Sequence, residues 1–255
     1  RQMCIRDREY GAQPSSIKDY FKVVFGAEGG DNATVNDQFN ALGNHVGAYI
    51  LQFNYKGQKA NYNFYYSHPF EDTSGREMTN WQDGLYGVFI DFKKQKAPIM
   101  HLLAEFTYTK NMSNNPVSIS GPDNYFNNGI YKSGWTYHGN TIGSPYFTPK
   151  PVDENGITSG VILGDNRFAA FNIGANGHVK WLPYKIMLSH TTYYGWFGQE
   201  YDSNPYQFSG ILDIVISQEK FNLPFDVAAS FAFDAGTYRP QNFGAFLSIT
   251  KTGSF

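Results

Sequence analysis

The chain has 255 residues and a formal net charge of −2, with 16% charged and 18% aromatic residues. Soluble domains carry about 25% charged residues, and the lower value here, together with many Gly, Tyr and Phe residues, predicts a β-rich chain with many turns. The slightly negative net charge argues against a nucleic-acid partner. The sequence has no run of about 18 apolar residues, which excludes a transmembrane helix but does not exclude a membrane β-barrel.

The first nine residues, RQMCIRDRE, differ in composition from the rest of the chain. They contain Arg1, Arg6 and Arg8, and the only cysteine, Cys4. No apolar segment or small-residue cleavage site follows, so the stretch is not an export signal. We interpret residues 1–9 as junction sequence outside the fold, with a genuine surface segment as the alternative. Without Cys4 the chain offers no disulfide and no cysteine-based metal site.

Alternating apolar and polar residues predict β-strands along the rest of the chain, and no helix of useful length is expected. In PIMHLLAEFTYTK, for example, Leu102 and Phe106 share one face of the strand, whereas His101 and Glu105 share the other. The pattern predicts about ten strands, the first of them weak. They are expected near 18–26, 44–57, 60–70, 84–94, 98–110, 166–176, 184–196, 207–217, 225–234 and 242–255.

The connections between these strands alternate in length. Because alternate connections of a meander lie at opposite ends of the sheet, one end should carry short turns and the other long loops, as in outer-membrane barrels. The connection at 235–241 is short but falls on the long-loop side. The other short connections are near 57–60, 94–97, 177–183 and 218–224, and the long ones are near 27–43, 71–83, 110–165 and 197–206.

Strands with one apolar face are expected in a soluble sandwich and also in a membrane barrel, but three features favour the barrel. The strands are long, aromatic residues cluster at strand ends, and the last strand ends in Phe255, which resembles the signal for barrel insertion. We predict an all-β fold, an antiparallel up-and-down transmembrane β-barrel forming one domain over 10–255, with a long outer loop at 110–165. Glu105, Asp91 and Asp213 should face the lumen, and lipid should contact Leu51, Phe53, Ile90, Leu102, Ile214 and Leu247.

The sequence shows no catalytic constellation. Its six histidines lack metal-ligand spacing, and the chain contains no nucleophile elbow. Glu71, Asp72, Glu77 and Asp83 share one segment and suggest glycoside hydrolysis, but a solvated loop explains them more simply. We therefore predict no enzymatic activity, no cofactor and no metal.

Four blocks resemble the Wzi-like capsule-assembly family of Bacteroidetes-type bacteria. They are NALGNHVGAY (40–49), EDTSG…NWQDGLYG (71–87), AEFTYTKNMS (104–113) and GPDNYFNNGIYKSGWTYHGNTIGSP (121–145). The resemblance implies a non-enzymatic outer-membrane barrel of about eighteen strands that helps to attach capsular polysaccharide to the cell surface. With only about ten strands and no signal peptide, the chain is expected to be the C-terminal part of a longer protein.

The resemblance also implies partners and leaves an alternative function. The implied partners are capsular or surface polysaccharide, outer-membrane lipid and the barrel-insertion machinery that recognises Phe255. The alternative is an outer-membrane porin or transporter whose long loop plugs the pore. A secreted glycosidase is a third, less favoured interpretation.

The segment at 121–147 combines seven aromatic residues with turn-forming Gly, Asn, Ser and Pro. One hypothesis is that Tyr125, Phe126, Trp135 and Tyr146 fold back to plug the barrel mouth. The other is that aromatic rings stack on sugar rings while short amides bind hydroxyl groups. The binding face should centre on Trp135, Tyr137 and Trp81. The full set of candidate residues is Trp81, Asp83, Asp123, Asn124, Tyr125, Asn127, Asn128, Tyr131, Trp135 and Tyr137.

Overall fold

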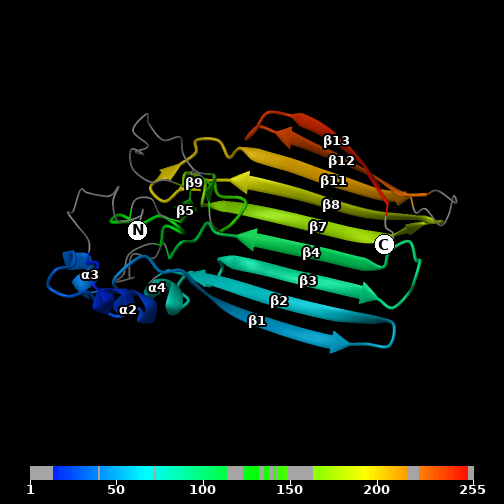
Figure 1. Cartoon of the computed structure of the whole chain (residues 1–255). Coiled ribbons are helices and arrows are strands. Elements are labelled where there is room, and N and C mark those ends of the chain that lie inside the picture. Colours follow the sequence, from blue (N-terminus) through cyan, green and yellow to red (C-terminus); the bar gives the residue numbers. More distant parts are fainter. Residues whose placement is uncertain are drawn as a thin grey trace.

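One antiparallel sheet forms most of the protein (Figure 1). The structure, a computed structural model, describes residues 14–39, 41–71, 73–113, 123–131, 135–137, 140–141, 143–148, 163–216 and 224–251. Residues 1–9 and Phe255 lie outside this part of the chain. The sheet contains nine strands: β1 (Gly47–Lys56), β2 (Ala60–Phe70), β3 (Gly84–Phe92), β4 (His101–Tyr108), β7 (Phe168–Val179), β8 (Leu182–Tyr193), β11 (Tyr206–Ile216), β12 (Asp226–Gly236) and β13 (Asn242–Thr250).

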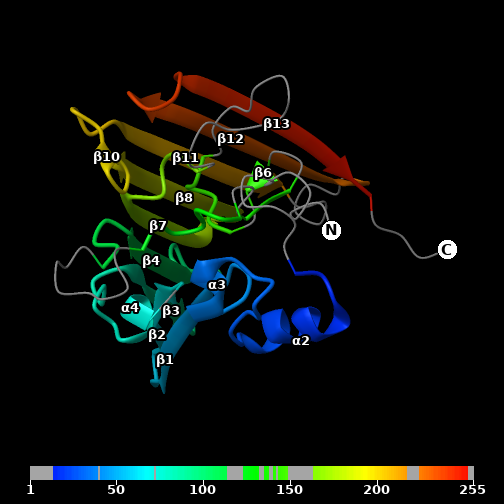
Figure 2. The ribbon, with the colours of Figure 1, turned by 90° about the vertical axis from the view of Figure 1, so that its left-hand side faces the viewer.

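The strands follow one another around the sheet in chain order, which confirms the predicted up-and-down antiparallel arrangement. Viewed from the long-loop end, the sheet curves through an arc from β1 to β13 and stays open on one side (Figure 2). Among the described residues, β1 and β13 are the edges, and each pairs with a single neighbouring strand of the sheet.

The register separates the apolar and polar residues onto opposite faces. Phe53 lies opposite Phe64, Phe64 opposite Val88, and Val88 opposite Ala104, so these residues share one face. All six residues expected to face lipid lie on that face, whereas Glu105, Asp91 and Asp213 lie on the other. The predicted division of the two faces is therefore confirmed.

The polar face is the concave one. Asn172 lies opposite Glu105 in the sheet, and its Oδ1 accepts a hydrogen bond from the Tyr146 hydroxyl in the long 109–167 connection. Figure 2 shows loop elements, including β6 (Asn140–Thr141) and α3 (Val35–Phe39), on the open, concave side of the arc. The apolar face is therefore convex and leaves large side chains exposed, such as Leu51 at 71%.

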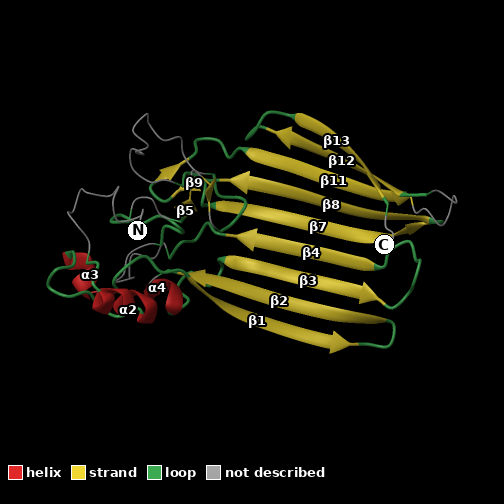
Figure 3. Cartoon of the chain, viewed as in Figure 1, coloured by secondary structure: helices red, strands yellow, loops and turns green. Residues whose placement is uncertain are grey.

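The predicted difference between the two ends of the sheet is also confirmed. Residues 57–59, 93–100, 180–181 and 217–225 connect strands at one end, and residues 71–83, 109–167, 194–205 and 237–241 at the other. The helices α2 (Ile17–Phe25), α3 and α4 (Thr73–Arg76) gather at this long-loop end (Figure 3). So do the hairpins of β5 (Thr136–Tyr137) with β6 and of β9 (Gly195–Trp196) with β10 (Gln199–Glu200).

The expected strand at 18–26 is wrong, because this segment forms helix α2. Ser16 accepts a hydrogen bond from the backbone N–H of Asp19, and the Asp19 carboxylate accepts one from the backbone N–H of Ser16, which makes a capping box. Gly26 ends the helix with a left-handed φ of 61°. The sheet consequently has nine strands instead of about ten, and β1 is its first edge.

Helix α2 also shows that the prediction of no helix of useful length is wrong. Ile17, Tyr20, Phe21 and Val24 recur at the three- and four-residue spacing of a helix, although a run this short also partly fits alternation. Within the described residues, no helix has the length and apolar character needed to cross a membrane.

Candidate functional site

A buried apolar cluster closes the sheet at its long-loop end. It joins the first residues of β7 and the last residue of β8 to the 109–167 connection. Residues 123–131 and 143–148 of that connection, which we call the plug, cover this end. The buried members of the cluster are Met112, Tyr125, Phe147, Leu163, Phe168, Ala170 and Tyr193.

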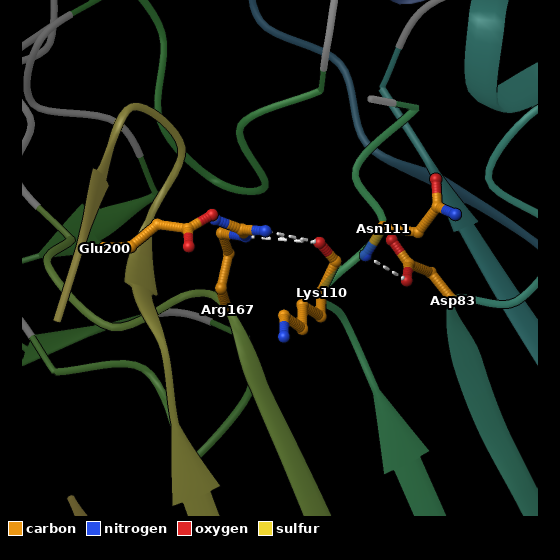
Figure 4. Close-up of polar contacts among 5 residues, drawn as sticks. All are labelled: Asp83, Lys110, Asn111, Arg167 and Glu200. Atoms are coloured by element: carbon orange, nitrogen blue, oxygen red, sulfur yellow. Dashed lines mark hydrogen bonds and ion pairs between the residues drawn. The ribbon is translucent and has the colours of Figure 1, made fainter. Parts of the chain in front are cut away.

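Asp83 ties the plug to strands β3 and β4. Its Oδ1 accepts the backbone N–H of Asn111 at 2.8 Å (Figure 4). Its Oδ2 accepts the N–H of Met112 at 2.7 Å and the hydroxyl of Tyr125 at 2.6 Å. Asp83 is fully buried, and burial raises the pKa of its carboxyl while the bonds from Tyr125 and Met112 oppose that rise. The buried carboxylate therefore accepts three hydrogen bonds from the 109–167 connection.

A second carboxylate extends this network. The Asn80 amide donates to the Tyr125 hydroxyl at 2.6 Å and to Oδ2 of Asp123 at 3.2 Å. The Ser113 hydroxyl also donates to Asp123. Since Asn80, Asp123 and Ser113 are all buried, the 71–83 loop and the plug form one packed unit.

Asparagine side chains hold the plug in shape. Asn127 exchanges two hydrogen bonds with the backbone of Leu163, at 2.9 and 3.0 Å. Asn166 donates to Oδ1 of Asn124 at 2.7 Å, and Oδ1 of Asn128 accepts the backbone N–H of Tyr131 at 3.0 Å. The Tyr131 hydroxyl in turn reaches the buried carboxylate of Asp37 at 2.8 Å, so the plug also contacts α3.

The structure brings most of the candidate binding residues together, but largely as buried members of this network. Asn124, Asn128 and Trp135 are half-buried. Trp81 is 61% exposed, and Tyr137 lies in β5, with its side chain outside the described part of the chain. The fully or nearly buried candidates are Asp83, Asp123, Tyr125, Asn127 and Tyr131.

The four aromatic residues of the plug hypothesis pack at the long-loop end of the sheet. Tyr125 is buried in the apolar cluster, and Phe126 and Tyr146 are partly buried against it. Trp135 meets the Phe126 ring edge to face at 6.2 Å between centroids. Tyr146 packs on Phe168 with 4.7 Å between ring centroids.

Charged residues missed by the sequence analysis line the base of the plug (Figure 4). Arg167 precedes β7 and donates from Nε and Nη2 to the carbonyl of Lys110 at 3.2 and 3.0 Å. Its Nη1 lies 2.5 Å from Oε1 of Glu200 in β10. The Lys110 ammonium lies 4.2 Å from the centre of the Tyr194 ring. The sequence signal was small: an arginine, rare in this chain, directly before a strand.

The concave face carries a second polar network nearer the short-turn end. His101 lies between Asp91 and Asn176 in the sheet, 3.3 Å from Oδ1 of Asp91 and 2.7 Å from Oδ1 of Asn176. Asn61 donates to Asp91 at 3.1 Å, and Tyr65 donates to Glu105. The described residues contain no group of three His, Cys, Asp or Glu side chains placed to hold a metal ion.

Comparison with known proteins gives one match. Residues 11–152, more than half of the chain, match the family model described as Capsule assembly protein Wzi. The matched region contains α2, strands β1 to β4, the 71–83 loop and the plug. No curated protein and no solved structure matches the chain.

Proposed function

The chain belongs to the Wzi family of capsule assembly proteins, and from this premise we propose that it binds capsular polysaccharide at the long-loop end of an outer-membrane barrel and helps to anchor or assemble it there. The observation that carries the proposal is the family match, which includes the 71–83 loop and the plug at that end. Those loops form a packed unit with exposed aromatic side chains at its edge, which is the kind of surface that sugars bind.

The convex apolar face supports the membrane part of the proposal. Large aliphatic and aromatic side chains are exposed over it, and such a surface is costly in water but suits the acyl chains of lipid. A wall in lipid needs every backbone N–H and C=O paired, so the edges β1 and β13 require further strands. Because an antiparallel sheet of nine strands has parallel edge strands, an odd number of additional strands completes an all-antiparallel barrel.

Trp81 is our first candidate for stacking on a sugar ring. Its indole is mostly exposed, whereas its backbone carbonyl accepts hydrogen bonds from the hydroxyls of Tyr66 at 2.7 Å and Tyr86 at 3.2 Å. The side chain is therefore presented from a fixed backbone, which lowers the entropic cost of binding. Trp135 and Tyr137 complete the proposed face, and the plug supports Trp135 through Phe126.

The test is capsule retention in cells that carry Trp81→Ala, Trp135→Ala or Tyr137→Ala. We expect less retained capsule and about tenfold weaker binding of purified protein to the polysaccharide, because loss of one stacked ring removes about 0.5–1.5 kcal/mol beyond buried area. Trp181→Ala is the matched control, because Trp181 is an exposed indole in the turn at the opposite end of the sheet.

Outer-membrane levels of each variant must equal those of the parent. If all three variants retain capsule and bind the polysaccharide as the parent does, the aromatic binding face is refuted and the plug role of the loop remains. If Trp181→Ala weakens binding equally, the effect is not specific to the long-loop end.

A loop-plugged porin or transporter is the second candidate, and the polar concave face favours it. Asp91, His101, Asn176 and Glu105 would give a pore a hydrophilic wall. In planar lipid bilayers, a polysaccharide-anchoring barrel with its plug in place should conduct ions poorly. Large, stable single-channel conductance from the unmodified protein would favour the pore.

A further inference from the structure

Arg167 is a buried cation that holds a solvent-exposed carboxylate at the base of the plug. The Arg167 side chain is 4% exposed, whereas that of Glu200 is 63% exposed. The bond of 2.5 Å between them therefore joins a fixed partner inside the protein to a partner at its surface.

The position of Arg167 does not depend on Glu200. Two of its guanidinium nitrogens, Nε and Nη2, donate to the carbonyl of Lys110, and its backbone N–H donates to Gly195 at 3.1 Å. Its own carbonyl accepts the N–H of Tyr194 at 2.8 Å. The guanidinium is therefore oriented by the backbone of two loops, which leaves Nη1 directed at the carboxylate.

Lys110 adds a second positive charge in the neighbourhood of Arg167. Its ammonium lies over the Tyr194 ring, and its charge acts on Glu200 together with that of Arg167. Hydrogen bonding to Arg167, and then the charges of Arg167 and Lys110, lower the pKa of the Glu200 carboxyl. The Arg167 guanidinium is thus the direct partner of the exposed carboxylate, and Lys110 adds a charge from further away. Glu200 belongs to the two-residue strand β10 of a small hairpin.

We propose that Arg167 and Lys110 form a subsite for the carboxylate groups of an acidic polysaccharide, and that Glu200 occupies this subsite when no polysaccharide is bound. Nη1 of Arg167 can donate a charge-assisted hydrogen bond to a carboxylate, a partner that a neutral sugar does not offer. This inference rests on the proposed polysaccharide-binding function and assigns a chemical class to its ligand.

Figure 4 shows how the residues of this subsite lie relative to Asp83. Glu200, Arg167, Lys110, Asn111 and Asp83 lie in one row across the ends of the strands. The 71–83 loop, which carries Trp81, ends at Asp83. The row therefore leads from the subsite toward the loop that carries Trp81.

The probe for the test is capsular polysaccharide from the strain that carries this gene, used as isolated and after chemical reduction of its carboxyl groups to alcohols. Binding to the full chain in detergent is measured for the parent, Glu200→Gln and Lys110→Met. Removing the competing Glu200 charge should tighten binding of the untreated polysaccharide about threefold to tenfold, and Lys110→Met should weaken it by a similar factor. Neither change should alter binding of the reduced form.

Glu77→Gln is the matched control, because Glu77 is an exposed carboxylate in the 71–83 loop. It should leave binding of both forms unchanged. If the parent binds both forms equally, or if Glu200→Gln weakens or fails to change binding of the untreated form, the subsite is refuted while polysaccharide binding stands. If the parent binds neither form, the proposed function fails and this inference fails with it.

Discussion

The Asp83 carboxylate satisfies donors from two segments that meet only in the folded protein. The backbone N–H groups of Asn111 and Met112 come from the start of the 109–167 connection, and the Tyr125 hydroxyl comes from the plug. An asparagine at this position would turn an NH₂ group toward one of these donors. The buried donor would then lack a partner, which costs about 1–3 kcal/mol.

We therefore predict that Asp83→Asn lowers the stability of the long-loop end by about 1–3 kcal/mol without changing the strands. The thermal midpoint in detergent should fall, and limited proteolysis should cut the plug earlier than in the parent. Asp202→Asn is the control, because Asp202 is exposed. Equal midpoints for Asp83→Asn and the parent would show that the network adds nothing to stability.

The same carboxyl predicts a pH dependence. Its folded-state pKa is raised above the ordinary value of 3.8, chiefly by burial, so the folded protein holds this proton more tightly than the unfolded chain does. The contribution of this group to stability is then complete below about pH 3.8 and is lost as the pH rises through the folded-state pKa. The midpoint difference between the parent and Asp83→Asn should consequently be larger at acidic pH than at pH 7. A difference that grows toward pH 7 would contradict this sign.

At the scale of elements, β4 provides a comparison of the two faces of the sheet. Leu102 lies on the convex face, and Glu105 lies on the concave face, where it accepts the Tyr65 hydroxyl. Leu102→Arg should cost about 2–4 kcal/mol if its face meets the middle of a bilayer, whereas Glu105→Gln keeps an acceptor for Tyr65 and should cost less. The measurement is the amount of assembled protein in the outer membrane. Equal loss for the two variants would show that the faces do not differ in environment.

Elements also show where sequence reasoning succeeds and where it stops. The strands were predictable because alternation is local, and β2 was placed at 60–70, where the structure has it. Helix α2 was missed because six of its nine residues are apolar, so that alternation and helical periodicity both fit part of it. Ser16 with Asp19, and Gly26 at the end, were the usable signal.

For the whole molecule, we predict that the protein in its native setting is an outer-membrane barrel that resists unfolding in detergent. It should fractionate with the outer membrane and migrate differently on a gel before and after boiling, because a closed barrel stays compact in the cold sample. Recovery in the soluble periplasmic fraction would contradict this prediction.

The arrangement of the site could not be predicted in the same way. Asp83 and Tyr125 are far apart in the chain, and their contact depends on how the long connection folds back over the sheet. Asn and Asp residues in this segment are equally consistent with turns and with sugar binding, because short polar side chains can hydrogen-bond to the backbone of a turn or to sugar hydroxyls. The sequence therefore indicated an aromatic segment that packs at the long-loop end, whereas the structure was needed to separate the buried candidates from exposed Trp81 in the 71–83 loop.

The difference in length between the connections also predicts an order in which the strands pair. Strands β7 and β8 pair along their full length through the turn at 180–181, so closing this hairpin costs little chain entropy. Pairing β4 with β7 must instead close the whole 109–167 segment, and each doubling of loop length adds about 0.6 kcal/mol to that cost. We therefore expect the sheet to assemble as two meanders that meet late at the β4–β7 seam. The Thr109 hydroxyl stabilises that seam beside the plug, because it donates to the carbonyl of Asn166 and accepts the backbone N–H of Phe168.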